Sequence, residues 1–135
     1  MTNHQNSLIL HLTNKLRKLS DKTYLFLASF WTILTLYLSL ISARQAAKFN
    51  VWDIVGVDKL GHLVFYTIFA FLWCMALARS RTSKKNILIF SISFGVFMEI
   101  CQLYLFNGRS FELYDILANI IGSYIGVILF KNFIN

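Results

Sequence analysis

The chain has 135 residues, of which 57% are hydrophobic, and a formal net charge of +7. Soluble domains average about 45–50% apolar residues even when glycine is counted, so this composition excludes an ordinary soluble domain. The positive charge could suggest nucleic acid, but the basic residues lie beside long apolar segments, where a membrane accounts for them. No nucleic-acid partner is therefore expected.

Residues 1–22 form a basic arm, which we assign to the cytoplasm. Aliphatic residues recur in it at helical spacing among lysine and arginine side chains: Leu8, Ile9, Leu12, Leu16 and Leu19. This pattern predicts either a short amphipathic helix on the anionic inner leaflet or a solvated, partly disordered arm.

Four apolar segments follow, each near the ~20 residues that cross the hydrocarbon core as a helix. They are Thr23–Ser42, Gly61–Ala78, Asn86–Phe106 and Leu113–Phe130. The connections between them are too short for a soluble domain. The sequence thus predicts an all-α fold, in which residues 23–135 form one integral membrane bundle of four transmembrane helices.

The basic residues are divided unequally between the two sides of this bundle. Nine fall on the side of the termini and the second loop: Lys15, Arg17, Lys18, Lys22, Arg79, Arg81, Lys84, Lys85 and Lys131. The other side carries Arg44, Lys48, Lys59 and Arg109. The positive-inside rule therefore predicts a multi-pass inner-membrane protein with both termini in the cytoplasm.

Glu99 lies in the middle of the third apolar segment. A charged residue at the centre of a span costs about 2.5–3.5 kcal/mol on insertion scales, so such residues usually face the protein interior and have a partner. From helical spacing, the partners expected for Glu99 are Asn119, Tyr66, His62 and Arg109.

Three predicted helices carry polar stripes at a similar depth in the outer third of the bilayer. Together with the loop before the last helix, they give a candidate binding site of Asp58, Lys59, His62, Tyr66, Glu99, Gln102, Arg109, Asp115 and Asn119. Purely structural roles are open for several of these residues. Asp58 and Asp115 are suited to helix N-termini, and Tyr66 to packing between helices.

Gly122 and Gly126 form a small-xxx-small pair on the last predicted helix. Such pairs let helices approach closely, so packing within the bundle is the favoured interpretation. Binding of another membrane protein at this face is the alternative.

Metal binding and catalysis have weaker support. Asp58, His62, Glu99 and Asp115 are chemically suitable metal ligands, but no ligand-spacing motif is present, and neither a metal nor another cofactor is expected. His62 and Glu99 could form a general acid/base pair. No catalytic motif accompanies them, so whether the protein is an enzyme stays open.

An ordered set of motifs resembles the VanZ-like family. It comprises Asp58-Lys59-x-x-His62-x-x-x-Tyr66, Glu99-x-x-Gln102, Gly108-Arg109-Ser110 and Asp115-x-x-x-Asn119-x-x-Gly122-x-x-x-Gly126. Asn107 departs from the proline that often precedes Gly-Arg in that family. The resemblance implies a small bacterial multi-pass protein of the inner membrane. The founding member is associated with low-level teicoplanin resistance, so glycopeptide resistance or cell-envelope homeostasis are the roles it suggests.

These observations lead to a hypothesis of a non-enzymatic protein that binds membrane lipids. Its outer-leaflet pocket would recognise the head group of an envelope lipid or a lipid-linked envelope precursor, with Arg109 and Lys59 available for a phosphate. The alternatives are a membrane-embedded enzyme acting on a lipid-phosphate substrate, and a structural partner of another membrane protein.

Overall fold

The computed structural model describes residues 14, 16, 19–39, 57–105 and 112–134. Within them the chain forms four long α-helices and no strand: α2 Asp21–Ser39, α4 Val57–Ala76, α5 Lys84–Leu105 and α6 Leu113–Phe133. The predicted all-α fold is confirmed. Of the basic arm, Asn14, Leu16, Leu19 and Ser20 are described, together with the start of α2, and the rest of the proposed amphipathic segment lies outside the described residues.

The helices extend beyond the apolar windows that predicted them. The helix expected from Gly61 begins at Val57, and the one expected from Asn86 begins at Lys84. The predicted segments contained only the apolar residues and left out the charged residues before them. The backbone is helical at these charged residues too, because charged side chains suit helix ends near a membrane surface. Asp58 and Lys59 consequently lie within the first turn of α4.

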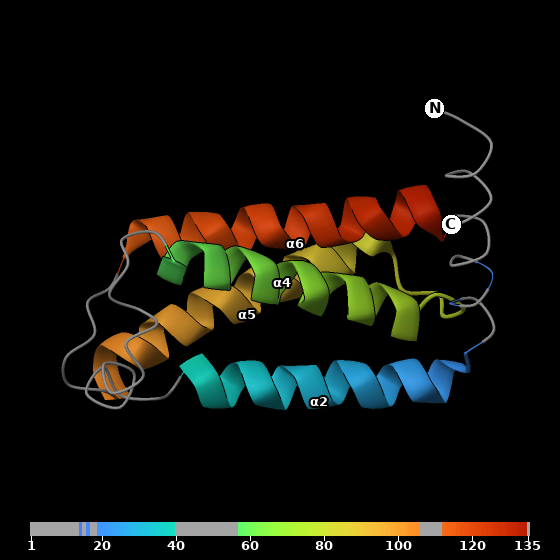
Figure 1. Cartoon of the computed structure of the whole chain (residues 1–135), viewed down its shortest axis with the longest axis horizontal. Helices are drawn as coiled ribbons and strands as arrows, with labels where there is room; N and C mark the ends of the chain where they lie inside the picture. Colours follow the sequence, from blue (N-terminus) through green and yellow to red (C-terminus); the bar gives the residue numbers. More distant parts are fainter. Residues whose placement is uncertain (1–13, 15, 17–18, 40–56, 106–111, 135) are drawn as a thin grey trace.

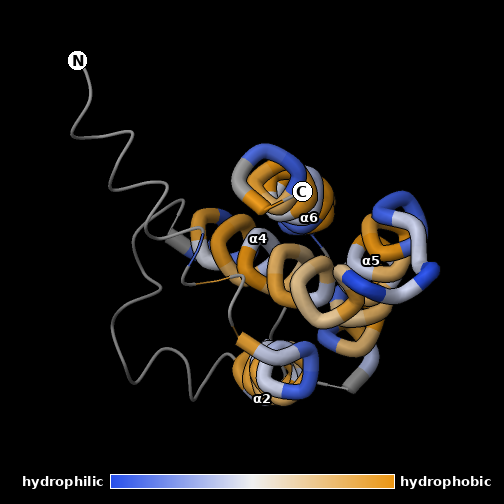
Figure 2. The backbone as a smooth tube through the Cα atoms, turned by 90° about the vertical axis from the view of Figure 1, so that its right-hand side faces the viewer, coloured by the Kyte–Doolittle hydropathy of each residue, from blue (hydrophilic) through white to orange (hydrophobic). Residues whose placement is uncertain are grey.

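Successive helices run in opposite directions (Figure 1), so α2 and α5 end where α4 and α6 begin. We call this the acidic end, because Asp58, Glu99, Glu112 and Asp115 all lie toward it. The opposite, basic end carries Lys22, Arg79, Arg81, Lys84, Lys85 and Lys131. Figure 2, seen from the basic end, shows hydrophilic residues at the near ends of α2, α5 and α6 and mostly hydrophobic residues along the helices.

The bundle surface is apolar and several of its buried side chains are polar. Large hydrophobic residues are exposed on all four helices, among them Phe26 and Phe30 on α2, Leu60 on α4, Phe97 on α5 and Ile121 on α6. The buried polar side chains are Thr35, Ser91, Glu99, Gln102, Asp115, Asn119 and Ser123. This distribution is the opposite of that in a soluble domain and suits a surface that faces lipid.

Three of the four helices are long and apolar enough to cross a membrane: Asp58–Ala76, Lys84–Tyr104 and Leu113–Asn132. The first predicted span is not among them. The described part of its helix, α2, begins with the charged residues Asp21 and Lys22, which lower its mean hydropathy. Among the described residues, the structure thus supports three membrane-spanning candidates.

The closest approach between helices is that of α4 and α6, which share the most extensive interface. A Cβ atom at Gly122 would overlap the carbonyl oxygen of Leu63, and one at Gly126 would overlap the carbonyl oxygen of Thr67. These glycines therefore let the two backbones touch. This contact within the chain accounts for both glycines, and an external helix partner at the same face stays a prediction.

Below the start of α4, aromatic rings fill the α4–α5 interface. Phe69 stacks on Phe94 with ring centroids 5.0 Å apart, and Trp73 meets Phe90 edge-on at 5.6 Å. We call these four residues the aromatic layer. Pairs of this geometry stabilise a packed interface beyond the area they bury.

The contact between Gly122 and Leu63 predicts that Gly122→Ala destabilises the bundle. Because the added methyl group meets backbone rather than a flexible side chain, we expect a loss of about 1–3 kcal/mol in the free energy of unfolding. Denaturation in detergent micelles, followed by tryptophan fluorescence, measures it.

The matched control is Ile121→Ala, at the adjacent, half-exposed position on the same helix. We expect it to change stability less than Gly122→Ala. Equal losses in the two variants would contradict close packing at Gly122.

Candidate functional site

Polar side chains from three helices meet at the acidic end of the bundle. We call them the His62 cluster, which consists of Asp58, Lys59, His62 and Tyr66 of α4, Glu99 of α5, and Glu112, Asp115 and Asn119 at the start of α6. The helical spacing explains each contribution, since residues four apart share one face. Asp58, His62 and Tyr66 follow this spacing on α4, as do Asp115 and Asn119 on α6.

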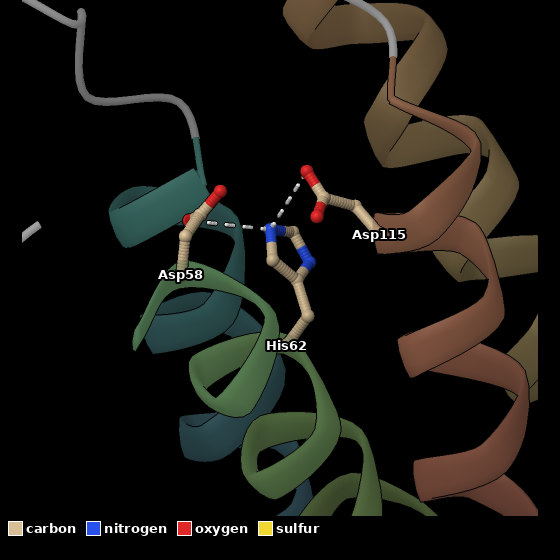
Figure 3. A group of neighbouring side chains, drawn as sticks. All are labelled: Asp58, His62 and Asp115. Atoms are coloured by element: carbon tan, nitrogen blue, oxygen red, sulfur yellow. Dashed lines mark ion pairs between the residues drawn. The ribbon is translucent and has the colours of Figure 1, made fainter. Parts of the chain in front are cut away.

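His62 is at the centre of the cluster, and its side chain is 10% exposed. Its Nδ1 atom lies 3.1 Å from Asn119 Oδ1 and 3.7 Å from Glu99 Oε1. Its Nε2 atom lies 3.8 Å from Asp58 Oδ1 and 3.8 Å from Asp115 Oδ2. Figure 3 shows the ring between the two aspartates, one from α4 and the other from α6. The imidazole thus contacts polar groups of all three helices.

Glu99 lies beside the partners that helical spacing suggested. Its side chain is 1% exposed and its carboxylate approaches His62. Tyr66 and Asn119 come together one turn deeper, where both would contact a Cβ atom at Gly95 at 3.1 Å. The glycine therefore makes room for them beside Glu99. Arg109, the fourth expected partner, lies outside the described residues.

Lys59 joins the start of α4 to the start of α6. Its Nζ atom donates a hydrogen bond of 2.6 Å to Glu112 Oε2 and lies 3.4 Å from Asp115 Oδ1. Glu112 occupies the N-cap position of α6, yet its side chain makes no capping hydrogen bond there. Lys59 is therefore engaged by two carboxylates rather than open toward a ligand.

Gln102 points away from the cluster. Its side chain is buried, and its Nε2 atom donates to the backbone carbonyl of Ser39 at 2.8 Å, at the last residue of α2. Gln102 thus ties the last described turn of α2 to α5.

Sequence reasoning did not assign roles to Glu112, Gly95 or the serines beneath the cluster. Ser91 and Ser123 share a buried hydrogen bond of 2.7 Å, and Ser123 also donates to the carbonyl of Asn119. Ser91, Gly95 and Glu99 repeat every four residues on α5, and Asn119 and Ser123 do so on α6. This four-residue spacing could have predicted that the polar faces of α5 and α6 continue deeper into the bundle.

The described part of the cluster is rich in negative charge. It contains four carboxyl groups but only one lysine and one histidine. Two of the carboxyl groups, those of Glu99 and Asp115, are buried. Part of this charge is stabilised by the N-termini of α4 and α6, where the helix dipole favours carboxylates. Because buried charges require compensation, the arrangement is suited to a cation.

Asp58, His62 and Asp115 are the described residues that could hold a metal ion together. One ligand atom from each lies within 4.8 Å of the other two. Three of the four ligand candidates named from the sequence are thus brought together, while Glu99 approaches the opposite nitrogen of the ring.

Part of this chain resembles a known protein. Over 74 residues the chain is 34% identical to a protein of the fission yeast Schizosaccharomyces pombe described as uncharacterized. That alignment covers 53% of this chain and 45% of the yeast protein, so the chain spans less than half of that relative's length. No solved structure matches the chain.

The model of the VanZ/LLP1 family matches residues 4–134, which is nearly the whole chain. The resemblance indicated by the ordered motifs is confirmed, and the chain belongs to the VanZ/LLP1 family.

Proposed function

We propose that this protein binds the head group of an envelope lipid or of a lipid-linked precursor at the His62 cluster. The observation that carries the proposal is Glu99, a carboxyl group 1% exposed within an otherwise apolar helix and held beside His62. Intramembrane ionisable residues are costly and usually mark a functional site. The cluster lies toward the end of three span-capable helices, where a head group can reach it.

The charges of the cluster restrict how a phosphate-bearing head group could bind. Lys59 and the N-termini of α4 and α6 attract an anion, whereas the four carboxyl groups repel it. Lys59 is already paired with Glu112 and Asp115. A phosphate therefore binds here together with a cation that the carboxylates hold, and the sequence adds Arg109 as a further contact.

We also propose that α2 is embedded as a fourth span. Thr32 and Thr35 donate to the carbonyl oxygens of Ala28 and Trp31 in the preceding turn, so their hydroxyl groups are satisfied inside the helix. Trp31 donates across to the carbonyl of Phe65 on α4. Hydropathy counts these side chains as polar although their hydrogen bonds are made internally. Phe26, Phe30 and Ile33 leave the outer face of α2 apolar.

We propose that the basic end faces the cytoplasm, because lysine and arginine are enriched in cytoplasmic segments, and that both termini are therefore cytoplasmic. In this arrangement the His62 cluster lies near the outer surface of the inner membrane.

Glu99→Gln should reduce the lipid that co-purifies with the protein in mild detergent. Removing the charge that His62 faces should lower retention by about tenfold, the change that corresponds to about 1.4 kcal/mol of binding free energy. Mass spectrometry of extracted lipids, normalised to protein, measures it.

The matched control is Asp21→Asn, which neutralises a carboxyl group paired with Arg79 at the basic end. We expect it to retain lipid as the wild type does. Equal lipid in all three proteins would refute head-group binding at the cluster.

The topology is tested with single cysteines labelled in intact cells by a membrane-impermeant maleimide. Tyr114→Cys, exposed at the acidic end, should react from outside, whereas Leu19→Cys and Ser83→Cys at the basic end should react only after permeabilisation. The signal of the wild-type chain, which contains Cys74 and Cys101, is the background. External labelling of Leu19→Cys would contradict a span formed by α2.

A membrane-embedded enzyme is the second candidate, favoured by the fixed orientation of His62. A hydrogen bond to Asn119 positions the ring, as in sites where an imidazole moves a proton. Release of phosphate from a lipid-phosphate substrate by the wild type, lost in His62→Gln, would support it. Lipid retention without turnover would favour binding alone.

A further inference from the structure

The two nitrogen atoms of His62 have different environments. Asn119 Oδ1 is a carbonyl oxygen and can only accept, so the 3.1 Å contact requires His62 Nδ1 to carry the proton. In the neutral ring, Nε2 then has a lone pair, and this lone pair faces the carboxyl groups of Asp58 and Asp115. Figure 3 shows Nε2 directed toward both. Three electron-rich atoms therefore face one another across a small space.

The distances from His62 Nε2 to the two aspartates exceed the length of a hydrogen bond. Nε2 lies 3.8 Å from an oxygen of each aspartate, whereas N–H···O hydrogen bonds measure about 2.7–3.2 Å. First-row divalent metals bind histidine nitrogen and carboxylate oxygen at about 2.0–2.2 Å, which places neighbouring ligand atoms roughly 3–3.5 Å apart. The three candidate ligand atoms lie within 4.8 Å of one another, so side-chain rotations would shorten these distances around a bound ion.

A buried polar atom beside this space gives a second observation. Asp115 is 4% exposed, and its Oδ1 atom accepts no hydrogen bond in the described part of the chain, although Lys59 Nζ lies 3.4 Å away. Buried polar groups are rarely left in this state, and an unseen ion or water is a usual reason.

We propose that Asp58, His62 and Asp115 bind one divalent transition-metal ion. A donor set of one imidazole nitrogen and two carboxylates favours Zn²⁺, Mn²⁺ or Fe²⁺ over the all-oxygen sites typical of Ca²⁺. Asn119 holds the ring through Nδ1, the arrangement that usually orients a metal-binding histidine. Three protein ligands leave an open coordination position, which a water molecule or a phosphate oxygen can fill.

This site would provide the cation on which head-group binding was proposed to depend. Metal binding is measured without lipid, so its outcome does not depend on head-group binding.

The test uses the full-length protein, purified in detergent, stripped with a chelator and titrated with Zn²⁺ and with Co²⁺. We expect one metal ion per chain by elemental analysis, and visible absorption bands from bound Co²⁺. His62→Gln and Asp115→Asn should each weaken metal binding by more than about tenfold. Even the loss of a residue that only hydrogen-bonds to a metal ligand lowers metal affinity by about 10–100-fold. Asp58→Asn, at a side chain 27% exposed, supplies a ligand variant with little risk to folding.

Asp21→Asn is the matched control, because it removes a carboxyl group at the basic end, away from the cluster. It should bind metal within about threefold of the wild type, whereas an attraction to the overall charge of the chain would weaken in all variants alike. Binding well below one ion per chain, or equal losses in Asp21→Asn and Asp58→Asn, would overturn the proposal. Metal bound at these residues without retained lipid would refute the head-group proposal alone.

Discussion

The arrangement of the site depends on the close contact between α4 and α6. Gly122 packs against the backbone of Leu63, the residue that follows His62. Asn119 lies one turn before Gly122, so the same contact sets the distance from Asn119 to His62. A larger side chain at the glycine would separate the two helices and the two polar groups together. Helix packing and the geometry of the His62 cluster are therefore not independent here, because one backbone contact determines both.

Helix periodicity predicted the main part of the site because residues four apart share a face, whatever the neighbouring helices do. From the sequence alone, this periodicity predicted that Glu99 lies beside His62. The direction of Gln102 could not be predicted in this way. Its amide reaches Ser39 on α2, and this contact depends on the tilt of α5 across the bundle (Figure 1). Likewise, the pairing of Lys59 with Glu112 depends on how two helix starts are placed side by side.

The polar side chains of α2 make their hydrogen bonds inside the bundle. Thr32 and Thr35 each donate to a carbonyl oxygen of their own helix. Trp73 donates to the Thr32 hydroxyl from α4, so this side chain has partners on two helices. Polar groups satisfied in this manner contribute to helix association instead of opposing burial. Composition alone therefore underestimates how well such a helix suits an apolar environment.

The aromatic layer has a consequence for the permeability of the bundle. Phe69, Phe90, Phe94 and Trp73 pack ring against ring on the inner side of the polar residues. An ion that moved past them would lose its hydration without gaining polar contacts from these rings, at a cost of several kcal/mol. Along the α4–α5 interface, this layer therefore separates the polar residues of the His62 cluster from the charged residues of the basic end by a purely apolar stretch.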